Sequence, residues 1–348
     1  MSHITLLAAF VAFAGITWVA GIWLTRATDA IDAKFKLGSA FGGLLILGVA
    51  TSLPEIAVAV SAAIQKHYGI VIGTLIGGIA IQTAVLCILD IRMRVKTSLT
   101  FAAASLTLVL EAAMVILVTV ASIMAIRTPM VIPHTSVSLM SVFILVLWVF
   151  GLWLVHRARK GLPWRAEAVA AQPGRGHQER RTVINHPALR KATTARIFAV
   201  FGLASLATLA AGVGLEVVGN RLAGVYHINS GLFAATVIAF TGALPNISTG
   251  IGSIKLGDYK LAMSDIFGGN AFMPALFVVC DLISGGSVLR NAGSSDVWFA
   301  ALGVLLTTVY LLGLIVRPKR TFLRMGIDSA VVIVLYFVGI ISLTLTNG

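Results

Sequence analysis

Charged residues are scarce in this chain. Only 11% of its 348 residues are Asp, Glu, Lys or Arg, whereas 58% are hydrophobic and the mean hydropathy is +0.97. Soluble domains carry about 25% charged residues, so this chain has too few to cover a globular surface. The composition also excludes intrinsic disorder, which needs low hydrophobicity and high charge. These shortages predict an integral, multi-pass membrane protein whose surroundings are a lipid bilayer.

Cysteine and acidic residues are rare as well. Cys87 and Cys280 both lie in apolar stretches, which favours packing over a disulfide or a metal pair. Lys and Arg number 26 against 13 Asp and Glu, which gives a net charge of +13. In a soluble chain this excess would suggest nucleic acid. Here the basic residues cluster between apolar stretches, so they indicate membrane orientation, and no nucleic-acid partner is expected.

The apolar stretches are long enough to be membrane spans, since a helix needs about 20 residues to cross the hydrocarbon core. Ten of them lie at 4–25, 39–65, 70–90, 98–126, 129–156, 197–219, 228–254, 261–284, 297–316 and 326–346. With the N-terminus outside, the inside loops hold 22 Lys and Arg residues and the outside loops hold four. The positive-inside rule therefore predicts that both termini lie outside.

The longest polar segment divides the spans into five and five. We interpret residues 1–156 as the first five-helix unit, 157–196 as a basic cytoplasmic linker, and 197–348 as the second five-helix unit. The linker is rich in Pro and Gly and, at about forty residues, is too short for a folded domain of normal size.

An internal repeat relates the two units. Residues 50–90 align without a gap to residues 241–281 at an offset of 191, with a Leu-Pro pair, a Gly-Gly pair and an Asp in one register. Five spans separate the copies, so they cross the bilayer in opposite directions. Inverted repeats are typical of secondary transporters, whose substrate site lies at the midplane where broken helices meet. We therefore expect an all-α protein of ten transmembrane helices arranged as two inverted five-helix repeats.

Two prolines at matched repeat positions, Pro54 and Pro245, fall inside apolar spans. Proline removes a backbone donor and clashes with the preceding turn, so it predicts a helix break at each position. The carbonyls that it frees need another partner, such as a neighbouring group, water or an ion.

Glu55, directly after Pro54, is the leading candidate for an ion ligand. A carboxylate at the centre of a span costs about 2.5–3.5 kcal/mol, so an acid inside the membrane indicates function. Thr51 and Ser52 precede it by one turn, and hydroxyl and carbonyl oxygens suit Na⁺, Ca²⁺, Mg²⁺ or a proton. In the second copy, Asn246 occupies the position that matches Glu55 and offers a neutral oxygen.

Other intramembrane polar residues are candidates for an additional ion or proton site. These are Thr74, Glu111, Asp265 and Asn270. Asp265 lies near the start of its span, where a helix-capping role is an equal alternative. We expect Glu216 and Asp296 to be solvated at span ends. Asp90 is expected to pair with Arg92 or Arg94, and Asp281 has no evident partner.

The two copies resemble the repeats of the cation/calcium antiporter superfamily, which includes sodium/calcium exchangers. Their signature is close to G-T-S-L-P-E followed by G-N-x-x-G-S-N-x-x-N. Here the first copy reads A-T-S-L-P-E from 50 and G-T-L-I-G-G-I-A-I-Q from 73; the second reads T-G-A-L-P-N from 241 and S-D-I-F-G-G-N-A-F-M from 264. The second copy is diverged: Asn246 replaces the glutamate, and Gly242 and Ala243 replace the Thr-Ser pair.

The resemblance implies an antiporter that exchanges small cations by alternating access. It implies a cation site formed by Thr51, Ser52, Glu55, Gln82 and Asn246, with Glu55 as the carboxylate that binds the metal ion. Na⁺ or H⁺ would be transported, with Ca²⁺ as a further candidate, and no cofactor is expected. It also implies a bacterial inner membrane as the location.

Two other classes of function remain open on the sequence. The substitutions in the second copy also fit a protein of the same fold that moves a different solute, or that acts as a non-transporting sensor or subunit. An intramembrane enzyme is disfavoured, since no span holds a Ser/His pair, an H-E-x-x-H motif or a paired-Asp motif in suitable context. The oligomeric state cannot be deduced.

Overall fold

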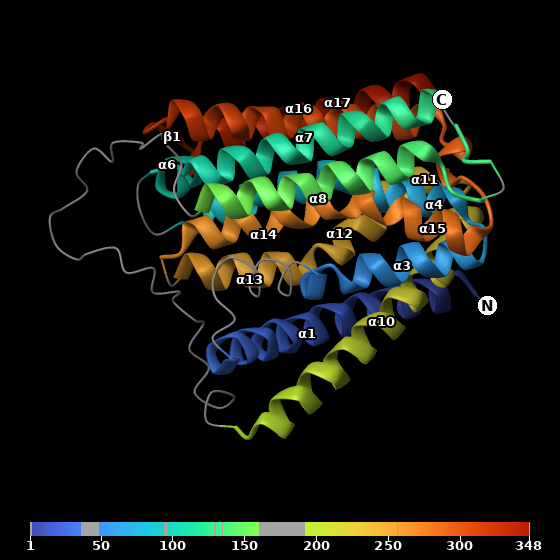
Figure 1. Cartoon of the computed structure of the whole chain (residues 1–348), viewed down its shortest axis with the longest axis horizontal. Coiled ribbons are helices and arrows are strands. Elements are labelled where there is room, and N and C mark those ends of the chain that lie inside the picture. The colour runs from blue at the N-terminus through green and yellow to red at the C-terminus, as the bar shows by residue number, and fades with distance from the viewer. Residues whose placement is uncertain are drawn as a thin grey trace, which may run out of the picture.

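A computed structural model describes residues 2–35, 49–93, 97–128, 130–133, 135–159, 192–255 and 257–347, which form a bundle of helices (Figure 1). In the first half the helices are α1 (His3–Phe35), α3 (Leu53–Ile64), α4 (Tyr68–Ile72), α5 (Gly78–Ile91), α6 (Leu99–Ala103), α7 (Leu106–Arg127) and α8 (Leu139–Arg159). In the second half they are α10 (Thr194–Val225), α11 (Ser230–Phe233), α12 (Ala239–Gly242), α13 (Leu244–Lys255), α14 (Tyr259–Phe272), α15 (Phe277–Ser284), α16 (Ser294–Val316) and α17 (Ile327–Asn347).

Short irregular segments complete these elements. Single π-helical turns, Gly73–Gly77 and Ala234–Ile238, join α4 to α5 and α11 to α12. Two short 3₁₀ segments, Met273–Leu276 and Val288–Asn291, flank α15. The strands β1 (Thr321–Phe322) and β2 (Met325–Gly326) pair antiparallel just before α17.

The apolar helices confirm the prediction of an all-α integral membrane protein. Seven continuous segments of the described chain are long and apolar enough to cross a bilayer, and the pair Ser230–Gly242 and Leu244–Lys255, bent by 41°, makes an eighth. Two shorter apolar helices, Leu53–Ile64 and Ile327–Leu343, lie in the remaining predicted spans. Most of the predicted linker, residues 160–191, lies outside the described residues.

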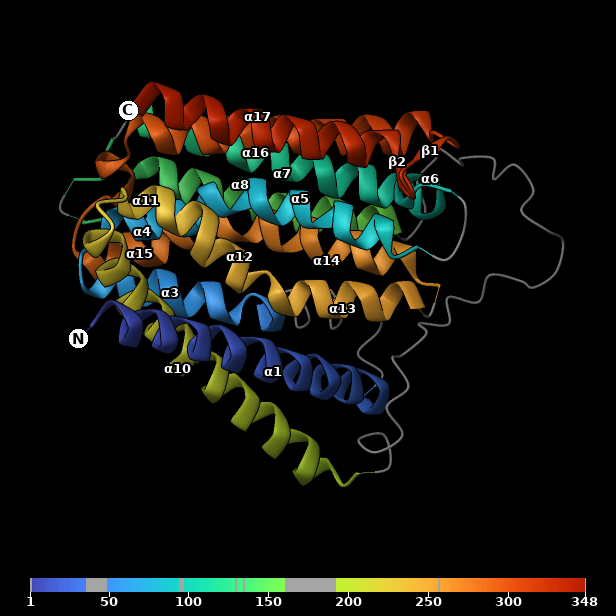
Figure 2. The same ribbon diagram turned by 180° about the vertical axis from the view of Figure 1, so that it is seen from behind.

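The spans differ in how deeply they are buried. The segments Tyr68–Ile91 and Tyr259–Ser284 have 89% and 67% of their most apolar windows buried, whereas α1 and α10 have 28%. The two repeat-bearing segments therefore form the centre of the bundle. In Figures 1 and 2, α1 and α10 form one edge, α16 and α17 form the opposite edge, and both termini lie at the same end.

Polar residues set several helix ends. The side chains of Ser105, Thr193 and Asp258 accept hydrogen bonds from backbone N–H groups in the first turns of α7, α10 and α14. Such caps satisfy donors that have no partner within the helix. At the other end of a helix, Gly285 adopts φ +74° and terminates α15, a left-handed conformation that glycine adopts without strain.

Asp90 and Asp281, the matched acids of the repeat, accept hydrogen bonds from residues at the start of α17 and α8, respectively. Asp90 accepts hydrogen bonds from Ser329 Oγ at 2.6 Å and from the backbone N–H of Gly326 at 2.6 Å. Asp281 accepts from the backbone N–H of Ser138 at 3.0 Å. The expected pairing of Asp90 with Arg92 is wrong, since backbone and hydroxyl donors surround the carboxylate; Arg94 lies outside the described residues.

Glu216 and Asp296 are not solvated as expected. Glu216 is fully buried on α10, where its carboxylate pairs with His67 Nδ1 at 2.6 Å and accepts hydrogen bonds from Ser61 and Gln65. Asp296 is 8% exposed and accepts the backbone N–H of Gly293 at 2.8 Å. Both carboxylates therefore accept hydrogen bonds at buried positions.

Candidate functional site

Each half of the chain has one helix break. In the first half, helical structure is interrupted at Ser52, before α3. In the second half it is interrupted at Ala243, before α13. Pro54 and Pro245 are therefore each the second residue of the helix that follows. Proline is tolerated there because the N–H groups of a first turn have no helical partner. Both breaks therefore lie at matched positions of the repeat.

Glu55 projects from the first turn of α3 and is 2% exposed. Gln82 Nε2 on α5 donates to Glu55 Oε1 at 3.4 Å. The other oxygen, Oε2, has no hydrogen-bond partner within the described part of the chain. A β-carbon built on Gly242 of α12 would lie 2.8 Å from the Glu55 carboxyl carbon. The glutamate therefore packs against bare backbone at the second helix break.

Asp265 is a second buried carboxylate, held by residues of both halves. It is 6% exposed on α14. Thr51 Oγ1 donates to its Oδ1 at 3.1 Å, and Thr249 Oγ1 of α13 donates to its Oδ2 at 2.8 Å. The capping alternative for Asp265 is wrong, because Asp258 caps α14. Thr51, which donates to Asp265, lies one turn before Glu55 in the chain, so the two carboxylates lie in one region.

Several buried oxygens near the breaks and on the central helices lack hydrogen-bond partners among the described residues. They are Glu55 Oε2, Asn246 Oδ1, Thr74 Oγ1, Ser264 Oγ and Asn270 Oδ1. A buried polar atom without a partner costs about 1–3 kcal/mol. Such atoms are the ones that a cation or an ordered water would satisfy.

The other candidates are placed differently. Ser52 lies against Gly269, where a β-carbon would be 3.4 Å from Ser52 Oγ. Asn270 turns toward the α5–α16 contact, since its Nδ2 donates to Thr83 Oγ1 at 3.1 Å. Thr74 lies in the π-helical turn between α4 and α5 and is 1% exposed.

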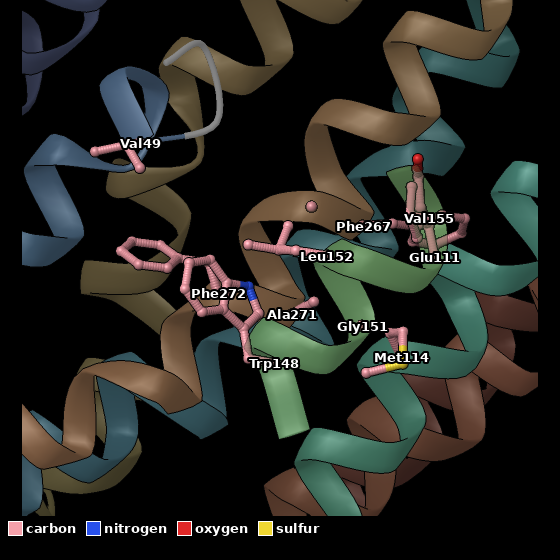
Figure 3. A pocket seen from close by; sticks show the side chains of 11 residues that line it. Val49, Glu111, Met114, Trp148, Gly151, Leu152, Val155, Phe267, Ala271 and Phe272 are labelled. Atoms are coloured by element: carbon pink, nitrogen blue, oxygen red, sulfur yellow. The ribbon is translucent and has the colours of Figure 1, made fainter. Parts of the chain in front are cut away.

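Glu111 lines a separate pocket. It lies on α7, and the lining of the pocket also includes Met114, Trp148, Phe267 and Phe272, from α7, α8 and α14 (Figure 3). Glu55, Gln82, Asn246 and Asp265 do not line this pocket. Val49 and Gly268 also line this pocket, and Val49 precedes Thr51 by two residues.

Sequence reasoning did not single out Thr249 and Ser264. Thr249 lies one turn beyond Pro245, and Ser264 directly precedes Asp265. A hydroxyl one turn from a helix-breaking proline, and another beside an intramembrane acid, are the signals that identify them.

The chemistry of these groups is that of a hard-cation site. Two carboxylates, hydroxyls and amide oxygens are the ligands that Na⁺, Ca²⁺ and similar ions prefer. Among the described residues, no cluster of three or more His, Cys, Asp and Glu side chains is positioned to hold a metal ion.

Comparison with known proteins agrees with this geometry. Residues 5–156 match the family described as sodium/calcium exchanger protein. No curated protein matches the chain at the significance required. The family match supports the predicted resemblance to the cation/calcium antiporter superfamily for the first half of the chain.

Solved exchangers share the fold of the whole chain. The crystal structure of the H⁺/Ca²⁺ exchanger CAX aligns with a TM-score of 0.67 and 11% identity, over 97% of this chain and 82% of that chain. A structure of the sodium-calcium exchanger NCX_Mj aligns with a TM-score of 0.59 and 17% identity, over 97% and 99%. Native YfkE aligns with a TM-score of 0.63 and 11% identity, over 96% and 91%. Together with the family match, the shared fold confirms the resemblance.

Proposed function

We propose that this chain is an ion-coupled cation antiporter of the sodium/calcium exchanger type, because residues 5–156 match that family and the chain shares the fold of solved exchangers. The observation that carries the proposal is Glu55, a buried carboxylate at a helix break with one oxygen unpartnered among the described residues. The exchangers that the chain matches are transporters, so it is not an enzyme.

The proposed cation site consists of Thr51, Ser52, Glu55, Gln82 and Asn246. Gln82 donates to one oxygen of Glu55 and leaves the other available. Asn246 Oδ1 likewise has no partner among the described residues and matches Glu55 in the repeat.

Asp265 supplies the second negative charge in this proposal. The position that matches Glu55 in the second copy is neutral, but Asp265 lies in the same region and is held by Thr51 and Thr249. Ca²⁺ takes 6–8 oxygen ligands, usually with carboxylates among them. Two carboxylates with these neutral oxygens support Ca²⁺ as the exported ion, with Na⁺ or H⁺ as the driving ion.

Reciprocal contacts support the proposal of two inverted five-helix repeats, residues 1–156 and 197–348. Gly21 of α1 packs on Pro245, and Gly212 of α10, its repeat counterpart at an offset of 191, packs on Pro54. In the same way Asp90 binds Ser329 whereas Asp281 binds Ser138, and these serines are also 191 residues apart. Each unit therefore contacts the other at matched positions, as a pseudo-two-fold axis requires.

We also propose ten membrane crossings with both termini outside, in a bacterial inner membrane. Both termini lie at one end of the bundle, and the β1–β2 hairpin and α6 lie at the other (Figure 1). The hairpin end carries Arg317, Lys319, Arg320 and Arg324. The basic excess at that end supports its placement on the inside.

The test is Ca²⁺ uptake into proteoliposomes under an imposed Na⁺ gradient and, separately, under a pH gradient. We expect uptake with one of the two gradients, and that gradient identifies the driving ion. Glu55→Gln should reduce uptake to the level of empty vesicles. Glu111→Gln makes the same chemical change at a buried glutamate outside the proposed site, and it should transport like the parent protein.

A second variant tests the role of Asp265 independently of that of Glu55. Asp265→Asn removes one charge while keeping the hydrogen-bonding shape, so we expect Ca²⁺ exchange to fall by on the order of tenfold or more. Equal uptake by the parent protein and Asp265→Asn would remove Asp265 from the site. Folded parent protein that shows no uptake with either gradient would contradict the antiporter proposal and favour a protein of this fold with another solute or a sensory role.

A further inference from the structure

An open groove lies along the contact between α1 and α10. It has a volume of about 880 Å³, and its apolar lining comes from the face of α1 that carries Gly15, Ile16, Val19 and Trp23 and from the face of α10 that carries Leu203. Figures 1 and 2 show that α10 diverges from α1 toward the end of the bundle opposite the termini. The groove lies between these two diverging helices.

Small and large apolar residues line the groove. One of the small ones is Gly15, where an added β-carbon would meet no atom within 4 Å. The larger ones include Ile16, Val19 and Leu203, which are 45%, 58% and 69% exposed. In a bilayer, apolar surface of this shape is filled by hydrocarbon rather than by water.

One end of the groove is cationic. Arg196, in the first turn of α10, is exposed and lines the groove. On α1 at the same end, the Arg26 guanidinium lies 5.0 Å from the ring centroid of Trp23. Lys34 Nζ also reaches across from α1 and donates to the carbonyl of Ala192, before α10, at 3.4 Å. An arginine beside an interfacial tryptophan is a site for a lipid phosphate, because guanidinium binds phosphate with two parallel hydrogen bonds.

We propose that this groove binds one phospholipid with an anionic headgroup. Its acyl chains lie against Gly15, Ile16, Val19 and Leu203, and its phosphate binds Arg196. The three basic side chains at this end favour a headgroup that carries no cation of its own. The bound lipid packs against both α1 and α10 and joins them. The proposal rests on the groove and its charges, so it stands or falls independently of the exchange activity.

Native mass spectrometry of the full chain in detergent tests the proposal, with phosphatidylglycerol and phosphatidylethanolamine added in equal amounts. We expect the parent protein to retain one phospholipid and to prefer phosphatidylglycerol by roughly tenfold. Gly15→Phe places a ring in open space within the groove and should abolish retention. Gly202→Phe is the matched control, because Gly202 on α10 also has no atom within 4 Å of an added β-carbon but does not line the groove.

Arg196→Gln tests the contact with the headgroup independently of the contacts with the acyl chains. We expect it to retain a phospholipid but to bind the two headgroups equally. Retention of lipid by Gly15→Phe at the level of the parent protein would overturn the proposal, and so would a lipid-free parent protein. Equal loss of lipid in Gly15→Phe and Gly202→Phe would also overturn it. An unchanged headgroup preference in Arg196→Gln would overturn the assignment of the phosphate.

Discussion

The absence of a side chain at position 242 determines where Glu55 lies. A β-carbon there would be 2.8 Å from the Glu55 carboxyl carbon, and real β-carbons do not approach another atom so closely. The threonine that the exchanger signature places at this position would therefore displace the carboxylate. The loss of a hydroxyl from the second copy is coupled to the position of the acid in the first copy.

Gly242→Ala should therefore impair transport without unfolding the protein. We expect gradient-driven uptake to fall by on the order of tenfold, because the methyl group moves the Glu55 carboxylate out of its place. Gly268→Ala is the control, since an added β-carbon there meets no atom within 4 Å. Equal uptake by the two variants, measured in the same proteoliposomes, would show that this contact does not position Glu55.

The hydrogen bonds of buried Glu216 give a prediction for stability. Glu216→Leu removes the acceptor for His67, Ser61 and Gln65, so we expect it to lower the free energy of unfolding by about 1–3 kcal/mol. His67→Gln keeps a hydrogen-bond donor and should cost less. Thermal unfolding in detergent measures both, and an unchanged Tm for Glu216→Leu would show that the pair contributes no stability.

Individual residues show what the sequence could and could not predict. Glu55 and its neighbours were identifiable because an acid beside a proline in an apolar stretch is conspicuous. The partners of Asp265 were not, because Thr249 reaches it only once α13 packs on α14. Glu216 was misjudged for the same reason: its three partners lie about 150 residues earlier in the chain.

At the scale of the elements, α1 and α10 each pack against the half of the chain to which they do not belong. A β-carbon on Gly21 would lie 2.5 Å from Pro245 Cγ, and one on Gly212 would lie 2.6 Å from the carbonyl oxygen of Pro54. Each long helix thus contacts the helix break of the opposite half. Glycine is required at both positions because no side chain fits between helix and break.

Leucine at either glycine should separate these elements. We expect Gly21→Leu and Gly212→Leu each to lower the free energy of unfolding by about 1–3 kcal/mol, the usual cost of overpacking. Gly224→Leu, also on α10 but with no atom within 4 Å of an added β-carbon, should change it little. Unfolding temperatures measured side by side would contradict the packing if all three variants matched the parent protein.

Hydropathy predicted where helices lie but not how they are interrupted. Every predicted span contains a helix in its described part, because a helix that crosses a bilayer must be apolar in composition. The π-helical turns at Gly73–Gly77 and Ala234–Ile238 were not predicted. They pack against each other across the two halves, a contact that no local pattern encodes.

At the scale of the whole molecule, inverted repeats require that matched turns lie on opposite sides of the membrane. Lys66, in the turn before α4, aligns with Gly257, in the turn before α14. Exposed lysines mark both regions, Lys66 in the first and Lys260 in the second. Their accessibility therefore reports the orientation of each repeat.

Single cysteines at these positions test the topology. We expect a membrane-impermeant thiol reagent, applied to intact cells, to label Lys66→Cys and not Lys260→Cys. The native Cys87 and Cys280 are 2% and 1% exposed and should not react. Permeabilised cells provide the control, in which both variants should label. Labelling of both in intact cells would contradict the proposed inversion.

Glu216 makes the two halves unequal in energy. Its repeat counterpart is Thr25, whose hydroxyl donates only to the carbonyl of Gly21 within α1. Two identical inverted halves would give outward-open and inward-open conformations of equal free energy. A coupling of about 1–3 kcal/mol present in one conformation alone shifts that ratio about 5–150-fold. In the proposed antiporter, a Glu216 contact that breaks when α10 moves from α3 would make the conformation described here the favoured one, and the transport cycle would be asymmetric even without a membrane potential.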